Sequence, residues 1–395
     1  MTSFWDASIY KNEQTERIKM DSEELNIVLG GGLVPGSFVL LSGEPGVGKS
    51  TLTLQMANWF AQGRKAAYVS CEENIYQVFA RANRLNIKNE NIEFLQEDKL
   101  ENILATLEDS DVDMAIIDSI SLIYSDNSTG VKWGVSQVKH IAGEFMNFSK
   151  RTGKSIILIG HITKDGDISG PKTLEHLVDV VLFMEGDAYE TFRILRANKN
   201  RFGATDEIGI FDMTEQGFVD LPNPSKDFVS SKNTYGNAIG VALEGTRALL
   251  VEIESLTVAS SYGYPKRSSR GVLPAKLDQM IAVATKYLWL GLDKFDCYTN
   301  IGRGLKIQDP ANDLSIIASL YSSFNSKTLN KAIFIGEVSL TGVVKNVPRI
   351  KKRIEEAKKL GYAPIYIPKG SYKGDMEGIV ELEYVSDLKK HFAAK

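Results

Sequence analysis

The chain has 395 residues, of which 43% are hydrophobic and 24% carry a charge. One ordinary core does not accommodate this length, so we expect two domains of a soluble globular protein. The formal net charge of −4 excludes a protein that coats nucleic acid with an overall positive surface. Any binding to DNA therefore has to come from local basic patches.

Cysteine usage and the first residues indicate the compartment. Cys71 and Cys297 are the only cysteines, and they lie far apart in the sequence. This excludes a disulfide framework and a Cys-x-x-Cys zinc site, so we predict no zinc and a reducing environment. Residues 1–20 lack the apolar stretch of a signal peptide, and no apolar run approaches the length of a membrane span. The prediction is a cytoplasmic protein with no membrane partner.

Residues 1–20 show no clear period and are expected to form an arm that leads into the first domain. Glu23–Leu29 predicts a short helix that ends at the glycine run 30–32. The apolar run Phe38–Leu41 then indicates a buried strand, and residues 51–61 carry apolar side chains at helical spacing. A glycine-rich stretch with the sequence of a phosphate-binding P-loop lies between this strand and this helix.

The P-loop pattern predicts a site for ATP and Mg²⁺. Its glycines let successive N–H groups point at phosphate oxygens, and the start of the helix adds its positive dipole end. Lys49 is expected to reach the β- and γ-phosphates, and the Ser50 hydroxyl to coordinate the metal. The residues predicted to bind the nucleotide are Gly43, Glu44, Pro45, Gly46, Val47, Gly48, Lys49, Ser50 and Thr51.

Carboxylates follow two further predicted strands. Asp118 ends the apolar run Met114–Asp118, where a P-loop enzyme holds its magnesium ion, although many strands end in Asp because it starts turns. Glu72 and Glu73 follow a strand at 66–71 and could orient or deprotonate the attacking water. We predict Glu72 as the base and keep Glu73 as the second choice. The alternative for both is a helix N-terminus, which favours Glu through the helix dipole.

Polar residues after another strand, Ser155–Gly160, are candidates for sensing the γ-phosphate. These are His161, Thr163 and Lys164, although a single histidine at a strand end is more often structural. Two polar loops, 124–134 and 164–172, combine cations with an aromatic residue or with glycines. Cations beside an aromatic ring suit single-stranded DNA, and ordinary surface loops are the alternative. The candidate DNA contacts in these loops are Lys132, Trp133, Lys164 and Lys172.

Strand and helix patterns alternate up to about residue 212, and the strands are apolar on both faces. This predicts an α/β domain with a largely parallel sheet covered by helices, over residues 21–220. A proline-rich, polar stretch at 221–234 predicts a linker, and residues 235–395 predict a separate α+β domain. The predicted strands of the first domain are 38–41, 66–71, 114–118, 155–160, 178–184 and 192–197, with helices at 75–85 and 135–151. In the second domain the predicted strands are 247–260, 297–307, 332–338 and 364–368, and the predicted helices are 273–290, a helix from 313, and 349–360.

The pentapeptide Lys199-Asn200-Arg201-Phe202-Gly203, together with the P-loop and the segments Gly160–Lys164 and Leu174–Asp179, resembles the bacterial RadA family. The resemblance extends from about residue 21 almost to the C-terminus. It implies a RecA-like ATPase domain that assembles as a homo-hexameric ring. The implied activity is that of a DNA-dependent ATPase and helicase, which drives branch migration in recombinational repair. The implied partners are single-stranded DNA, branched recombination intermediates and a recombinase.

The resemblance also implies a role for two cations of that pentapeptide. Lys199 and Arg201 would project into the ATP site of the neighbouring subunit. A cation placed against the γ-phosphate stabilises charge in the transition state, an effect worth about 10³–10⁵ in rate. If a neighbouring copy carries this cation, hydrolysis depends on assembly.

The second domain resembles the Lon protease domain in the form that the RadA family carries. Lon uses a Ser–Lys dyad, but Ala311 stands at the position of the serine, while Lys351 stands at that of the lysine. Ser315, one helical turn further, is a weak candidate for a displaced nucleophile. We therefore predict a proteolytically inactive domain. Its basic cluster of Lys266, Arg267 and Arg270 suits DNA phosphates, with a solvated loop as the even alternative.

The sequence departs from the family pattern at its N-terminal end. Family members begin with a four-cysteine zinc module, which this sequence lacks. Two other functions stay open at this point. One is a RecA-like ATP-binding scaffold that assembles without motor action. The other is an ATP-dependent peptidase, which Ala311 argues against.

Overall fold

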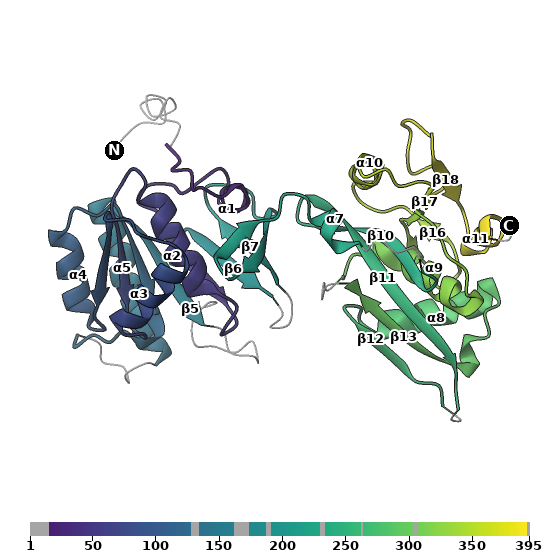
Figure 1. Ribbon diagram of the computed structural model, residues 1–395, viewed down its shortest axis with the longest axis horizontal. Coiled ribbons are helices and arrows are strands. Elements are labelled where there is room, and N and C mark those ends of the chain that lie inside the picture. The colour runs from purple at the N-terminus through teal and green to yellow at the C-terminus, as the bar shows by residue number, and fades with distance from the viewer. Residues whose placement is uncertain are drawn as a thin grey trace. The chain divides into compact units, whose positions relative to one another are not determined.

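The computed structural model describes residues 16–127, 134–161, 174–186, 191–229, 234–261, 264–302 and 307–392 (Figure 1). The chain divides into two compact units, Met1–Pro222 and Asn223–Lys395. The division falls within the stretch 221–234 that the sequence suggests as a linker. Within the described ranges, no helix has the length and apolar character needed to cross a membrane.

The first unit is built on a nine-stranded sheet with the order β3-β2-β4-β5-β1-β6-β7-β8-β9. The first six strands of the chain pair in parallel, whereas β7, β8 and β9 continue the sheet as antiparallel neighbours. The strands are β1 (Phe38–Gly43), β2 (Ala66–Ser70), β3 (Ile92–Gln96), β4 (Met114–Asp118), β5 (Ser155–His161), β6 (Val180–Glu185), β7 (Phe192–Asn200), β8 (Ile208–Thr214) and β9 (Gly217–Asp220).

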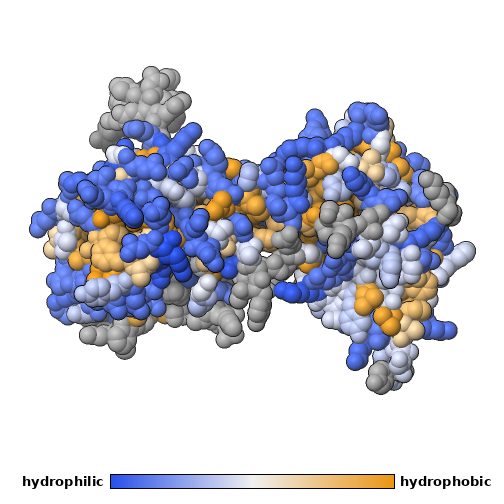
Figure 2. All heavy atoms as spheres, viewed as in Figure 1, coloured by the Kyte–Doolittle hydropathy of each residue, from blue (hydrophilic) through white to orange (hydrophobic). Residues whose placement is uncertain are grey.

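Helices cover this sheet on both faces, so each face has its own apolar core. Leu52, Met56 and Phe60 of α2 lie in one core, and Ile141 and Phe145 of α5 lie in the other. Two apolar layers explain why the central strands carry apolar residues without alternation. The face drawn in Figure 2 is largely hydrophilic, as expected when apolar side chains fill these cores. The helices are α1 (Glu23–Val28), α2 (Lys49–Phe60), α3 (Ile75–Arg84), α4 (Leu100–Asp109) and α5 (Val135–Thr152), with the 3-10 turn η2 (Ile120–Leu122).

The first unit contains elements that the sequence patterns do not predict. The edge strand β3 and helix α4 follow α3, and the antiparallel strands β8 and β9 follow β7. The end of the predicted arm also packs on the unit. Ile18 pairs with Leu33, Met20 is buried, and the Arg17 guanidinium donates a hydrogen bond to the Phe202 carbonyl at 2.5 Å.

The second unit is a seven-stranded mixed sheet with the order β12-β13-β11-β10-β14-β17-β18. Helix α7 lies inside the predicted linker, and its Ser225 hydroxyl donates to Glu356 at 2.8 Å. The predicted strand 332–338 is instead two short strands of different sheets, β14 and β15, separated near Gly336. The strands are β10 (Asn237–Glu244), β11 (Arg247–Ala259), β12 (Arg267–Arg270), β13 (Phe295–Ile301), β14 (Ile333–Phe334), β15 (Glu337–Val338), β16 (Val344–Lys345), β17 (Ile365–Pro368) and β18 (Ile379–Leu382). The helices are α7 (Pro224–Phe228), α8 (Pro274–Leu288), α9 (Asp313–Asn325), α10 (Ile350–Lys359) and α11 (Leu388–Phe392).

Candidate nucleotide site

The residues predicted to act on ATP lie at the carboxyl edge of the parallel strands. The P-loop begins where β1 ends at Gly43, and Asp118 ends β4, two strands away in the order β4-β5-β1. β2, which precedes Glu72, lies beside β4. Open α/β sheets bind ligands outside the carboxyl ends of their strands, so this edge is the place for the nucleotide.

The P-loop needs glycine for two different reasons. Gly46 has φ +78° with open space around it, so its backbone conformation alone excludes most side chains. Gly48 has φ +110°, and a Cβ atom there would lie 2.7 Å from the ring of Phe218 on β9. Strand β9, one of the antiparallel strands of the sheet, therefore packs against the P-loop through Phe218.

Lys49 points into the loop that surrounds it. Its Nζ donates to the carbonyl oxygens of Gly43 at 2.9 Å and Glu44 at 3.0 Å, and the residue is 4% exposed. Burial lowers the pKa of Lys49, while the carboxylates of Asp118 and Glu72 oppose this shift. The ammonium group is thus held where phosphate oxygens would replace the two carbonyls as acceptors.

Asp118 and Ser50 have the chemistry of a magnesium site. Tyr68 donates its phenol proton to Asp118 Oδ2 at 2.6 Å, and Ser50 lies close enough to the Asp118 carboxylate to affect its pKa. Burial raises the pKa of Asp118, and Tyr68 and Ser50 counteract the rise. Protein-bound Mg²⁺ usually takes few protein ligands and completes its shell with water and phosphate oxygens. One hydroxyl and one carboxylate fit that pattern, and in the described part of the chain no three His, Cys, Asp or Glu residues gather into a larger cluster.

Glu72 and Glu73 differ in their surroundings. Glu73 forms an ion pair with Arg81 of α3 at 2.6 Å, and its backbone carbonyl accepts a hydrogen bond from Ser70. Glu72 is exposed, and its charge acts on Lys49 inside the P-loop. The two neighbours therefore face different partners, one toward α3 and one toward the phosphate-binding lysine.

Lys199 and Arg201 lie at the opposite end of the sheet from the P-loop of their own chain. Arg201 pairs with Asp179 at 3.3 Å, and the other oxygen of Asp179 accepts the N–H of Phe38, the first residue of β1. The P-loop starts at the far end of β1, so the length of this strand, roughly 17 Å, separates it from Arg201. The Lys199 Nζ donates to the carbonyls of Glu175 at 2.5 Å and Val178 at 2.8 Å. Neither cation contacts the P-loop of its own chain.

Several predicted residues lie outside the described residues: Thr163, Lys164, Lys132, Trp133 and Lys172. His161 ends β5, so its backbone reaches the same edge as Asp118, but its side chain is also outside the described part. The sensor and loop assignments remain predictions.

The basic cluster of the second unit lies on and beside the edge strand β12. The Lys266 N–H donates to Asp296 at 2.8 Å, and the Arg267 guanidinium pairs with Asp278 at 3.2 Å. Arg270 ends the same strand and is exposed. Exposed pairs such as Arg267–Asp278 contribute little stability, so the strand can present these cations to phosphates.

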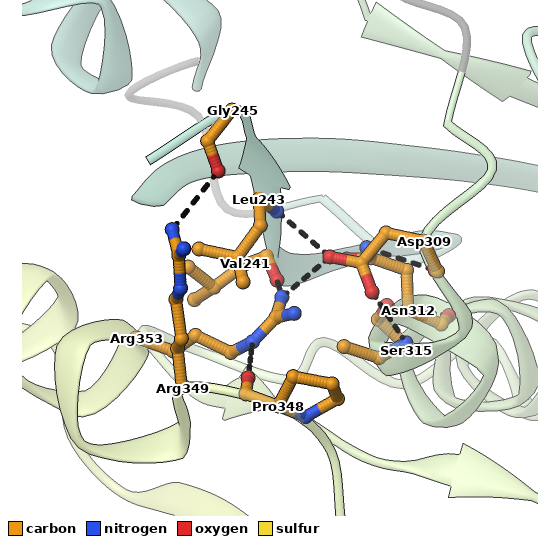
Figure 3. Close-up of polar contacts among 10 residues, drawn as sticks. Val241, Leu243, Gly245, Asp309, Asn312, Ser315, Pro348, Arg349 and Arg353 are labelled. Atoms are coloured by element: carbon orange, nitrogen blue, oxygen red, sulfur yellow. Dashed lines mark hydrogen bonds and ion pairs between the residues drawn. The ribbon is translucent and has the colours of Figure 1, made fainter. Parts of the chain in front are cut away.

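Ala311, which the sequence suggests as the match to the Lon serine, is fully buried and follows Asp309, whose ion pair with Arg353 is drawn in Figure 3. Asp309 Oδ1 accepts the N–H of Ala311 at 3.0 Å, and Asp309 Oδ2 accepts the N–H of Leu243 at 2.7 Å. Arg353 of α10, 1% exposed, donates to that same Oδ2 at 2.6 Å and to the carbonyls of Val241 and Pro348. Asp309 and Arg353 therefore connect three segments of the chain by hydrogen bonds. These two side chains occupy the region where a catalytic Ser–Lys dyad would lie.

The other two candidate members of the dyad are unsuited to catalysis. Ser315 is fully buried and donates its hydroxyl proton to the carbonyl of Asn312 at 2.8 Å. The Lys351 side chain is 74% exposed and lies 3.8 Å from Glu355 on the same helix. A nucleophile and base in hydrogen-bond contact are what such a reaction requires, and these residues do not provide them.

Sequence patterns did not identify three residues that shape the nucleotide site. Tyr68 looks like one more apolar position of a buried strand. Arg193 of β7 is buried and donates to the Val47 carbonyl of the P-loop at 3.0 Å. Phe218 packs behind Gly48. All three contact site residues that are distant in the sequence, so local patterns do not reveal them. For Arg193 the one available signal was a charged residue within a predicted apolar strand.

Fold and site together define the class of this protein as a P-loop ATPase with a RecA-like sheet. A family model described as an AAA domain matches residues 6–167. DNA repair protein RadA of Campylobacter jejuni is 45% identical over 361 residues, covering 90% of this chain and 80% of the relative. RadA of Halalkalibacterium halodurans is 42% identical over 362 residues (91% and 79%), and RadA of Streptococcus pneumoniae is 41% identical over 387 residues (95% and 92%). The chain belongs to the RadA family.

Solved structures also resemble this chain. A KaiC-like protein of Pyrococcus horikoshii has a TM-score of 0.44 and 19% identity, covering 53% of this chain and all of the other. The RadB recombinase has a TM-score of 0.41 and 20% identity, covering 52% of this chain and 99% of the other.

Proposed function

We propose that this chain is a DNA-dependent ATPase and helicase that promotes branch migration in recombinational DNA repair. It acts as a homo-hexameric ring on single-stranded DNA and branched recombination intermediates. The relatives of this chain are named DNA repair proteins, which supports a role in DNA repair. The single observation that carries the coupling of hydrolysis to assembly is the location of Lys199 and Arg201, away from the P-loop of their own chain.

In this proposal the two cations complete the ATP site of a neighbouring copy. The Arg201 side chain is 53% exposed and its pair with Asp179 lies at the surface, so little free energy opposes its release. Burial and the nearby Arg201 charge lower the pKa of Lys199, and a triphosphate that approached the two cations would oppose this shift because it is attracted to both. A guanidinium can bind phosphate oxygens in a bidentate manner and stabilise charge that develops on the γ-phosphate.

The remaining roles fall to residues of the same chain. The P-loop N–H groups and Lys49 bind the phosphates, and Ser50 with Asp118 would hold Mg²⁺, which neutralises phosphate charge when bound. Glu72 orients the attacking water and accepts its proton, because Glu73 is already paired with Arg81. His161, Thr163 and Lys164 report the state of the γ-phosphate to the DNA-binding loops. The second unit contributes DNA contacts through Lys266, Arg267 and Arg270 and has no proteolytic role.

Mixed rings test the central claim. Arg201→Ala subunits lack the donated cation and Glu72→Gln subunits lack the base, so each alone should hydrolyse ATP slowly. In an equal mixture, about a quarter of the interfaces of a head-to-tail ring would combine an intact base with an intact cation. We expect ATPase activity to recover to that extent in rings shown by native mass spectrometry to contain both variants.

The control is Arg151→Ala, which removes another surface arginine, 59% exposed and paired with Glu108. Its mixture with Glu72→Gln should follow simple dilution of activity. Mixed Arg201→Ala rings that also follow dilution would show that the cation does not act between subunits. Equal ATPase rates with and without single-stranded DNA, or hydrolysis without strand displacement, would instead reject the motor and favour the scaffold.

A further inference from the structure

Tyr68 lies behind the residues that would hold the magnesium ion. It is the third residue of β2, is fully buried, and pairs in register with Ile116 of β4. Ser70 pairs with Asp118 two residues further along. Because side chains alternate across a strand, Tyr68 and Asp118 point to the same face of the sheet. That face is the one covered by α2, which begins at Lys49 and Ser50.

The phenol of Tyr68 is directed at one acceptor. Its hydroxyl donates to Asp118 Oδ2 at 2.6 Å, a length typical of a hydrogen bond to an ionised carboxylate. Hydrogen bonds to a charged group are stronger than those between neutral groups. The bond fixes the rotation of the carboxylate at the point where β4 ends and the nucleotide edge begins.

The polar groups around Asp118 and Tyr68 have other hydrogen-bond or ion-pair partners. Arg81 and Glu73 also act electrostatically on Asp118, but they are bound to each other at 2.6 Å. The Thr53 hydroxyl beside Tyr68 donates to the carbonyls of Lys49 and Ser50 in α2. Among the described side chains of β2, Tyr68 is therefore the one that donates a hydrogen bond to the Asp118 carboxylate. A phenylalanine would fill the same space, so packing alone does not require the hydroxyl.

We propose that Tyr68 is a positioning residue of the Mg²⁺–ATP site, which orients the Asp118 carboxylate toward the metal and thereby sets how tightly Mg²⁺–ATP is held. This inference rests on the proposed roles of Ser50 and Asp118. Partners that orient metal-binding groups typically change metal affinity by about 10–100-fold when they are removed.

The test is Tyr68→Phe in the full chain, which deletes one oxygen and keeps the ring. We expect binding of a fluorescent, slowly hydrolysed ATP analogue without Mg²⁺ to be unchanged. The Mg²⁺ concentration that gives half of the metal-dependent gain in binding should rise on the order of tenfold. The Mg²⁺ dependence of ATPase activity should shift in the same direction. A matched control is Tyr366→Phe, which removes a hydroxyl from a buried tyrosine of the second unit and should shift neither.

Two results would separate the inference from the function on which it rests. Asp118→Asn is expected to raise the required Mg²⁺ concentration further than Tyr68→Phe does. If Asp118→Asn shifts the Mg²⁺ requirement and Tyr68→Phe behaves like the unmodified chain, the positioning role is overturned while the metal site stands. If Asp118→Asn itself shifts nothing, the proposed metal site fails and the role of Tyr68 fails with it.

Discussion

Adjacent glutamates after β2 have different environments, and we expect this difference to determine which of them serves as the base. We predict that Glu72→Gln lowers kcat by about 10²–10⁴ and leaves ATP affinity nearly unchanged, because it removes only the proton acceptor. Glu73→Gln should cost much less in kcat, since its carboxylate is paired with Arg81. Steady-state ATPase kinetics with a separate nucleotide-binding titration measure both. A larger kcat loss for Glu73→Gln than for Glu72→Gln would reverse the assignment.

At the scale of elements, the P-loop depends on a strand that the loop sequence does not reveal. Gly48→Ala adds a methyl group at φ +110°, 2.7 Å from Phe218 of β9. The backbone strain and the contact should displace the loop and weaken ATP binding by about tenfold or more. Gly63→Ala is the matched control, because Gly63 is exposed and an added Cβ meets no atom within 4 Å. Equal dissociation constants for the two variants would contradict this support role for β9.

Sequence patterns predict the central elements of the first unit and miss its edges for a physical reason. β1 and β4 are apolar on both faces because helices cover both sides, and such runs are recognisable in isolation. In β3, at the edge of the sheet, Ile92 is the one buried residue, so the apolar signal is weak. The residues of the candidate site also fall into those that a local pattern predicts and those that it does not. The P-loop and Asp118 are local patterns, whereas Tyr68 meets Asp118 only because β2 and β4 become neighbours.

The Arg353–Asp309 pair connects β10, the turn before α9, and α10 in the region where the sequence suggests a match to the Lon dyad. Arg353→Ala would remove the buried partner of this ion pair and leave the partly buried Asp309 carboxylate without its cation, which should cost about 3–5 kcal/mol of unfolding free energy. Lys351→Ala on the same helix removes a side chain that is 74% exposed and should change stability by no more than about 0.5 kcal/mol. Urea unfolding of the second unit measures both values. Similar midpoints for the two variants would show that the ion pair contributes nothing.

At the scale of the whole molecule, the two units divide the proposed work. The first contains every described residue that we assign to ATP chemistry, and the second contains a buried ion pair where a peptidase would need reacting groups. A net charge of −4 means that the chain as a whole does not attract DNA. Affinity for DNA then has to come from small groups of cations. Each group that contacts phosphates contributes to the slope of log affinity against log salt.

The cations around β12 provide the last prediction. Replacing Lys266, Arg267 and Arg270 together by alanine should weaken DNA binding to a similar degree for unrelated sequences, because phosphate contacts carry no base information. Each lost phosphate contact should also reduce the slope of log affinity against log salt by about 0.7 on single strands. Fluorescence anisotropy with labelled oligonucleotides at several salt concentrations measures affinity and slope together. The control replaces Lys345, Lys369 and Lys390, exposed lysines of the same unit that pair with carboxylates, so the net charge changes equally. If both triple variants give the same slope, β12 is an ordinary solvated edge, and the DNA contacts of this protein lie elsewhere.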